Sequence, residues 1–324
     1  MDPQLVQNLR YKLQKRVRRL NSVGVDIFAP TLRQFWTFFD ERPMYSGVAR
    51  SLMFRFPNAS KTMERILAGE ALVGASEEES AAIGHEILRS VAREDRNVDI
   101  FQLAYPYGQP SQLGDALELV REIFLEPFYE YVDESLDDQR AMLALLLRYK
   151  HRSEWFHRSY LWNLVQTESQ KAEKSLALDL YSFFYDQGID FTIEPSSLTG
   201  EIDLIAAQGS SDPLLADAKV FDADGRGKAY IRKAFRQIYS YTQQYNEAFG
   251  YLMIFKTGEK DLRFSLKATN TDIPVVCYNH KTIFLITVDI YQYPKPVSQR
   301  SPLSTIEVTE EELITTVQEP GETS

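Results

Sequence analysis

The sequence predicts an α/β protein in which an N-terminal all-α domain precedes an α/β domain with a central mixed sheet. Apolar residues recur at helical spacing through most of the first 160 residues. Between about residues 190 and 290, short apolar runs alternate with turn residues and one long helical pattern. A length of 324 residues is also long for a single core, which favours two domains.

Composition and net charge exclude some classes of protein and predict a location in the cell. The net charge of −10 excludes a protein that coats nucleic acid nonspecifically, although it leaves a locally basic site open. The single cysteine, Cys277, excludes an intrachain disulfide and predicts a reducing, cytoplasmic location. The N-terminus lacks an apolar signal core, and no run approaches the ~18 apolar residues of a membrane span, so we expect no membrane partner.

The first helix begins at Asp2-Pro3, a good N-cap and first-turn pair, and carries leucines and a valine at helical spacing. Its other face holds a basic stripe, which consists of Arg10, Lys12, Lys15, Arg16, Arg18 and Arg19. Such a stripe either is a solvated helix face or follows a phosphate backbone, and the sequence leaves both interpretations open.

Helical patterns continue from Ala29 to about Arg96, with a capping box formed by Ser76 and Glu79. Residues 97–114 contain two prolines and two glycines and are predicted to be a loop. Residues 113–131 and 137–149 are again helical in pattern. We therefore expect a helical domain over residues 1–160, and no motif indicates its role.

An amphipathic helix is predicted over Glu168–Gln187, with Leu176 and Leu180 on its inward face. Glu173 lies at the edge of that face and Glu168 lies on another face, so Glu173 is better placed to point toward the sheet, with Glu168 as the reserve. The alternative is that Glu173 is an ordinary solvated glutamate. Residues 190–194 alternate in polarity and should form the first strand of the sheet.

Residues 200–220 contain two apolar runs joined by a turn, which predicts a β-hairpin. Asp203 lies in the first run, and Asp217 and Lys219 lie in the second. Alternate residues of a strand share a face, so Asp217 and Lys219 project to the same side. Mg²⁺ prefers carboxylate oxygens and would offset the cost of burying Asp203 and Asp217 together.

The next helix is predicted over Ala229–Ala248, with Gln237 and Tyr241 one turn apart on its surface. Four further apolar runs reach Ile290 and complete a mixed sheet. Residues 293–324 are acidic and rich in proline, and we expect a mobile tail with at most a short helix near residues 310–317.

The order of these motifs resembles the PD-(D/E)xK nuclease superfamily, which has a restriction-endonuclease-like fold. The residues that carry the resemblance are Gly200–Asp203, Asp217-x-Lys219 and Gln237-x-x-x-Tyr241, together with a glutamate on the preceding helix. The resemblance covers roughly residues 165 to 290 and predicts a nuclease domain over 161–292. The sequence departs from the family in having aspartate for the commoner glutamate of the second motif, and no proline before Asp203.

The resemblance implies a nuclease dependent on Mg²⁺ or Mn²⁺ that hydrolyses DNA with a metal-activated water. Asp203, Asp217 and Glu173 would hold the metal, Lys219 would act on the nucleophile or the transition state, and Gln237 would position substrate or water. The side chains expected to contact nucleic acid are those of Arg226, Lys228, Arg232, Lys233, Arg236 and Tyr241.

The resemblance also suggests a bacterial restriction or antiphage system, with a homo-oligomer or a defence partner protein as further expectations. RNA remains an alternative substrate. Two other interpretations stay open: a module that binds nucleic acid or a partner without cleaving, and a helical half that senses a ligand and gates the nuclease.

Overall fold

The computed structural model describes residues 3–93, 95–96, 98–169, 171–187, 204–206, 214–267, 273–295, 299–300 and 302–318. These residues form two compact units, one spanning Pro3–Ala141 and the other beginning at Met142. The division falls inside one long helix, α8 (Glu126–Trp155), whereas the sequence predicts a boundary near residue 160.

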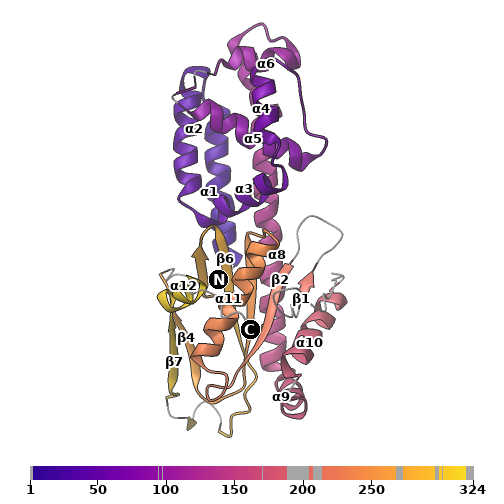
Figure 1. The fold of residues 1–324 in the computed structure, drawn as a ribbon, viewed down its shortest axis with the longest axis vertical. Helices are drawn as coiled ribbons and strands as arrows, with labels where there is room; N and C mark the ends of the chain where they lie inside the picture. The colour runs from indigo at the N-terminus through magenta and orange to yellow at the C-terminus, as the bar shows by residue number, and fades with distance from the viewer. Residues whose placement is uncertain are drawn as a thin grey trace. The chain divides into compact units, whose positions relative to one another are not determined.

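The first unit is all helical, as predicted (Figure 1). Its helices before α8 are α1 (Pro3–Ser22), α2 (Val25–Asp40), α3 (Pro43–Arg55), α4 (Ala59–Leu67), α5 (Glu77–Ala92), α6 (Ile100–Gly108) and α7 (Leu113–Val120). A π-helical turn, η1 (Arg121–Leu125), joins α7 to α8. The predicted capping box is confirmed, because the Ser76 hydroxyl accepts a hydrogen bond from the Glu79 amide at 3.1 Å.

Aromatic side chains fill the core of the helical unit. Trp36 and Phe39 of α2 lie within 5.6 Å of the Phe128 ring of α8, measured between ring centroids. Leu13 and Leu20 of α1 are also buried. α6 replaces the loop expected between residues 97 and 114: the Asp99 carboxylate caps its first amides, so the helix forms despite Pro106.

The second unit contains the α/β fold. After α8 come two helices, α9 (Arg158–Thr167) and α10 (Ala172–Asp186), and the main sheet has the order β1-β2-β3-β6-β5. Its strands are β1 (Leu204–Ala206), β2 (Leu214–Phe221), β3 (Phe249–Lys256), β5 (Val275–Tyr278) and β6 (Lys281–Asp289). β2, β3 and β6 are parallel, while β1 and β5 pair antiparallel at the edges, so the sheet is mixed as predicted.

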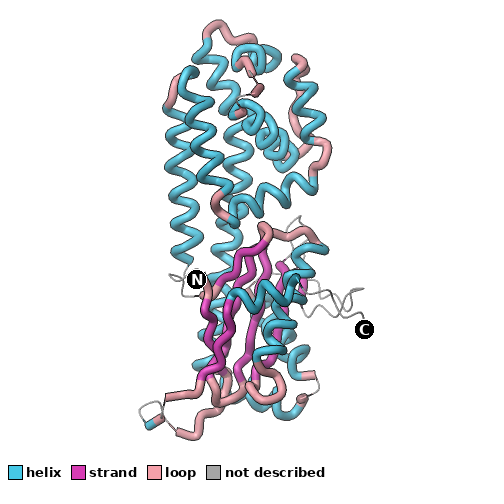
Figure 2. The backbone as a smooth tube through the Cα atoms, turned by 60° about the vertical axis from the view of Figure 1, so that its left-hand side comes forward, coloured by secondary structure: helices cyan, strands magenta, loops and turns pink. Residues whose placement is uncertain are grey.

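Helices cover both faces of this sheet (Figure 2). On one face, α11 (Lys228–Gln244) buries Ile231, Phe235 and Ile238 against Leu252 and neighbouring strand residues. On the other face, the ring of Tyr149 in α8 contacts those of Phe183 in α10 and Phe255 in β3. The strands between these helices are therefore buried on both sides, which accounts for the continuous apolar runs of β3 and β6.

The C-terminal residues fold back onto the same unit, where a mobile tail is expected. β4 (Asp261–Ser265), expected in the mixed sheet, instead pairs in parallel with β7 (Thr305–Thr309) in a separate two-stranded sheet. α12 (Glu310–Gln318) follows at the position of the predicted short helix. Val308 and Leu313 are wholly buried in the apolar cluster beneath α11. Apolar and polar residues alternate in the segment TIEVT, which is typical of a strand, although the acidic composition of this region predicts a mobile tail.

A search of the described residues for a membrane span finds no helix of sufficient length and hydrophobicity.

Candidate active site

β2 places Asp217 and Lys219 side by side on one face of the sheet. They pair in register with Leu252 and Ile254 of β3, which belong to the apolar cluster under α11, so both charged side chains lie on the α11 side. The Asp217 residue is 1% exposed and Lys219 is 6% exposed. Their side chains form an ion pair, with Lys219 Nζ 2.9 Å from Asp217 Oδ1. The predicted two-residue spacing therefore produces a buried ion pair.

Glu173 of α10 joins this pair. Its Oε2 lies 3.9 Å from Lys219 Nζ, and its Oε1 accepts a 2.9 Å hydrogen bond from the backbone amide of Val220. The Lys219 ammonium thus lies within ion-pair distance of two carboxylates that are far apart in sequence. Glu168, the reserve candidate, instead accepts a hydrogen bond from Ser175 at the start of α10. The structure brings Glu173, Asp217 and Lys219 together, and Glu168 belongs to another contact.

Tyr230 is a member of the site that sequence reasoning missed. Its hydroxyl donates a 2.5 Å hydrogen bond to Glu173 Oε1, so α11 and α10 are linked beside β2. Burial raises the pKa of Tyr230 well above the usual value, and the Glu173 carboxylate raises it further. The phenol therefore remains protonated and serves as a donor. The only local signal is its position in the first turn of a helix that follows the Asp-x-Lys strand.

Gln237 and Tyr241 lie further along α11. Gln237 is partly buried, and its Nε2 donates a 2.8 Å hydrogen bond to the Tyr241 hydroxyl. The Tyr241 residue is 1% exposed and belongs to the apolar cluster, a position that differs from the expected surface contact with nucleic acid. The predicted one-turn pairing is present, and it joins the two side chains to each other.

Two of the five basic side chains expected to contact nucleic acid are engaged by α12. Lys228 pairs with the Glu312 carboxylate at 2.5 Å, and Arg232 donates to the Thr316 hydroxyl at 2.9 Å. Arg226 reaches the Ser169 carbonyl at 3.4 Å. On α11, Lys233 is exposed and Arg236 is partly buried. Fewer basic side chains of α11 are therefore available to contact nucleic acid than the sequence predicts.

Asp203 lies outside the described residues, and so do Gly200, Glu201 and Ile202 of the same motif. The described part of the predicted hairpin is an antiparallel pair in which Leu204 faces Ala216. Leu204 follows Asp203 in the chain, and Ala216 precedes Asp217.

The donor set beside Lys219 suits a hard divalent cation, because Asp217 and Glu173 supply carboxylate oxygens. Within the described ranges, however, no group of three or more histidine, cysteine, aspartate or glutamate side chains could hold a metal ion. A complete ligand set would need a further oxygen donor, and Asp203 is the residue that the sequence offers.

Comparison of the chain with models of known families, with curated proteins and with solved structures finds no match.

A second buried cluster lies at the carboxyl ends of β3 and β6. Lys256 is 1% exposed, donates to the Tyr293 hydroxyl and lies 3.5 Å from Asp289 Oδ1. Tyr293 in turn donates to Asp289 Oδ2 at 2.9 Å, and Arg158 of α9 lies 3.8 Å from Asp289. Burial lowers the pKa of Lys256. These contacts join α9 to the strand ends, and no local motif predicts them.

Proposed function

We propose that the protein is a metal-dependent nuclease that hydrolyses phosphodiester bonds of DNA. The observation that carries the proposal is the meeting of Asp217, Lys219 and Glu173, which come from a strand and a separate helix. Two carboxylates and one ammonium together can hold a cation and neutralise charge that develops on a phosphate.

The side chains take distinct roles in this proposal. Asp217, Glu173 and Asp203 would hold Mg²⁺ or Mn²⁺, which supplies a Lewis acid and an activated water when bound. Lys219 donates to the attacking water or to the phosphate oxygens. Tyr230 holds Glu173 in position through its hydrogen bond. Gln237 would orient substrate or water through its side-chain amide.

Burial of the pair favours a second candidate function. Asp217 and Lys219 are almost inaccessible, so their contact would also suit a structural ion pair in a module that binds nucleic acid or a partner without cleaving it. In that case the pair would specify how β2 packs against its helices, and its removal would lower stability with no activity to lose.

The test uses the full chain and a Lys219→Ala variant, each incubated with plasmid, single-stranded DNA and RNA in Mg²⁺, Mn²⁺ or EDTA. We expect cleavage of DNA only with metal, and a loss of about 10²-fold or more in the variant. Lys174→Ala is the matched control, because Lys174 is exposed on α10 next to Glu173. It should cleave like the unsubstituted chain.

Cleavage that survives EDTA, or equal cleavage by the Lys219→Ala and control variants, would contradict the proposal. The structural alternative is recognised by a different pattern, in which no condition produces cleavage while Lys219→Ala lowers the melting temperature. RNA cleavage at a higher rate than DNA cleavage would keep the chemistry and change the substrate.

A further inference from the structure

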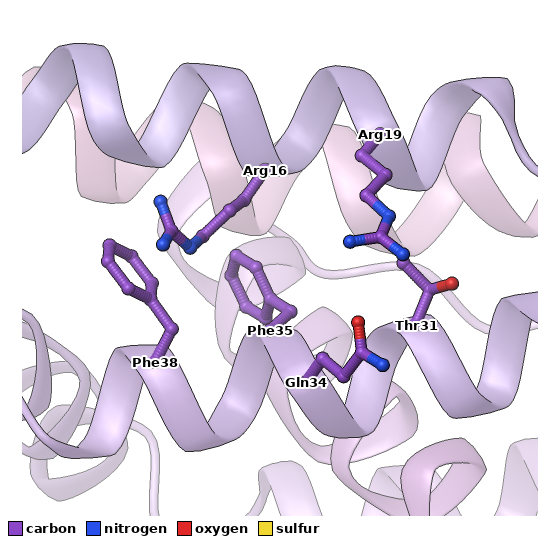
Figure 3. Close-up of a pocket in the computed structure, with 6 residues that line it drawn as sticks. All are labelled: Arg16, Arg19, Thr31, Gln34, Phe35 and Phe38. Carbon is purple, nitrogen blue, oxygen red and sulfur yellow. The ribbon is translucent and has the colours of Figure 1, made fainter.

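The basic stripe on α1 divides into two parts. Arg10 is used internally, since its guanidinium pairs with the Asp133 and Asp137 carboxylates of α8. Arg16 and Arg19 face the opposite neighbour, α2 (Figure 3), where a recess of about 180 Å³ lies between the two helices. We name this recess the arginine notch; it is lined by Arg16, Arg19, Thr31, Gln34, Phe35 and Phe38.

Positive charge is concentrated at one end of the notch. The Arg16 guanidinium carbon lies 3.3 Å from the centroid of the Phe38 ring, and the Arg42 guanidinium carbon lies 3.8 Å from it. Burial, followed by the Arg42 charge, lowers the pKa of Arg16. Among the described residues, neither Arg16 nor Arg19 forms an ion pair with a carboxylate. An anion placed beside Arg16 would relieve its repulsion with Arg42.

Polar side chains of both helices line the same recess. In Figure 3, the Arg16 and Arg19 side chains extend from α1 toward α2, and Gln34 lies near Thr31 on the facing helix. Guanidinium forks match phosphate oxygens in geometry, so the two arginines are the groups of the notch that suit a phosphate. The notch is smaller than the ~300 Å³ of a typical small-molecule pocket. It therefore suits one phosphate group of a larger molecule that remains mostly in solvent.

We propose that the arginine notch binds a backbone phosphate of a nucleic-acid strand. This assignment rests on the proposed function only in taking nucleic acid as the source of the phosphate. The net charge of −10 disfavours binding of a polyanion to the chain as a whole, so a local cluster of arginines would decide where the strand contacts the helical unit.

The test measures binding of labelled single-stranded and duplex DNA by fluorescence anisotropy in EDTA, where no cleavage is expected. The variant Arg16→Gln with Arg19→Gln should bind the preferred strand about ten-fold or more weakly and lower the salt slope by about 1. The matched control, Arg18→Gln with Arg50→Gln, removes two charges from exposed residues outside the notch and should change affinity far less.

A third variant separates loss of phosphate binding from misfolding, because replacing Arg16 also removes its packing on Phe38. Gln34→Glu preserves side-chain size at an exposed position, adds a carboxylate to the notch and should weaken binding while the melting temperature stays unchanged. Equal losses in the two arginine pairs, or full affinity in Gln34→Glu, would overturn the assignment. So would binding of inorganic phosphate or a mononucleotide at the notch without binding of a strand. Because binding is read without metal, failure of cleavage and failure of the notch are distinguishable.

Discussion

Tyr230 is the residue on which the position of Glu173 depends. Glu173 Oε1 receives two hydrogen bonds, one from the Tyr230 phenol and one from the Val220 amide. Hydrogen bonds of this kind hold a carboxylate in a single orientation at little entropic cost when the donors are themselves fixed by packing. Tyr230 packs against the apolar cluster, so it is such a fixed donor.

We predict that Tyr230→Phe lowers the free energy of unfolding by about 1 to 2 kcal/mol, because a hydrogen bond to a charged acceptor is lost. The same change should raise the Mg²⁺ concentration needed for half-maximal cleavage, since Glu173 retains only the Val220 donor. Urea denaturation and a metal titration of the cleavage rate measure the two effects. Tyr185→Phe on exposed α10 surface is the control and should alter neither.

The sequence predicts that Asp217 and Lys219 lie together because their relation is local: two residues on one strand share a face. The edge of an amphipathic helix likewise predicts Glu173. The contacts of Glu173 with Val220 and Tyr230 cross 47 and 57 residues, and only the packing of α10 and α11 on β2 brings them about. For the same reason the cluster of Lys256, Asp289 and Tyr293 left no pattern in the sequence.

Among the elements, α12 begins with a reciprocal cap. The Glu312 carboxylate accepts from the Thr309 amide at 2.9 Å, and the Thr309 hydroxyl accepts from the Glu312 amide at 3.3 Å. Lys228 of α11 pairs with the same carboxylate and is the main reason that the pKa of Glu312 falls to about 2. The Glu312 side chain therefore both caps the N-terminus of α12 and pairs α12 with α11.

This arrangement predicts a pH dependence of stability. The folded pKa lies below the ordinary value of 4.5, so the contribution of Glu312 is fully present above about pH 4.5 and is lost as the pH falls toward about 2. Solvent screens this partly exposed pair, which limits its contribution to about 1 kcal/mol. The difference in stability between the unsubstituted chain and Glu312→Gln should shrink across that window in acid denaturation. Glu311→Gln, at an exposed neighbouring position, should show no such difference.

The elements that periodicity predicted were those with strong apolar patterns, namely the hairpin at β2, the helix α11 and the buried strands β3 and β6. α6 was missed because its proline and glycine dominate the local pattern, although Asp99 caps the helix. β7 was missed because its stability comes from pairing with β4, about 40 residues earlier, and its polar composition resembles that of a solvated segment.

At the scale of the whole molecule, each unit has its own hydrophobic core. Phe128 is buried in the aromatic cluster of the helical unit, and Phe235 is buried in the cluster between α11 and the sheet. Separate cores imply that the two units respond separately to loss of packing, even though the division between them falls within α8.

We predict that Phe128→Ala and Phe235→Ala each cost about 3 to 5 kcal/mol, as expected for a buried aromatic ring. In calorimetry, each substitution should lower the melting temperature of one transition and leave the other nearly unchanged. Equal shifts of a single transition in both variants would show instead that the chain unfolds as one cooperative unit.

The parallel pairing of β4 with β7 has a consequence for synthesis. β4 leaves the ribosome long before β7, so the apolar cluster around Leu262 and Val308 cannot close until the last strand has been translated. Translation that stops after residue 293 would produce a polypeptide with an exposed strand edge, which favours aggregation or binding by chaperones. Translation must therefore pass residue 309 before the unit that carries Asp217 and Lys219 can complete its core.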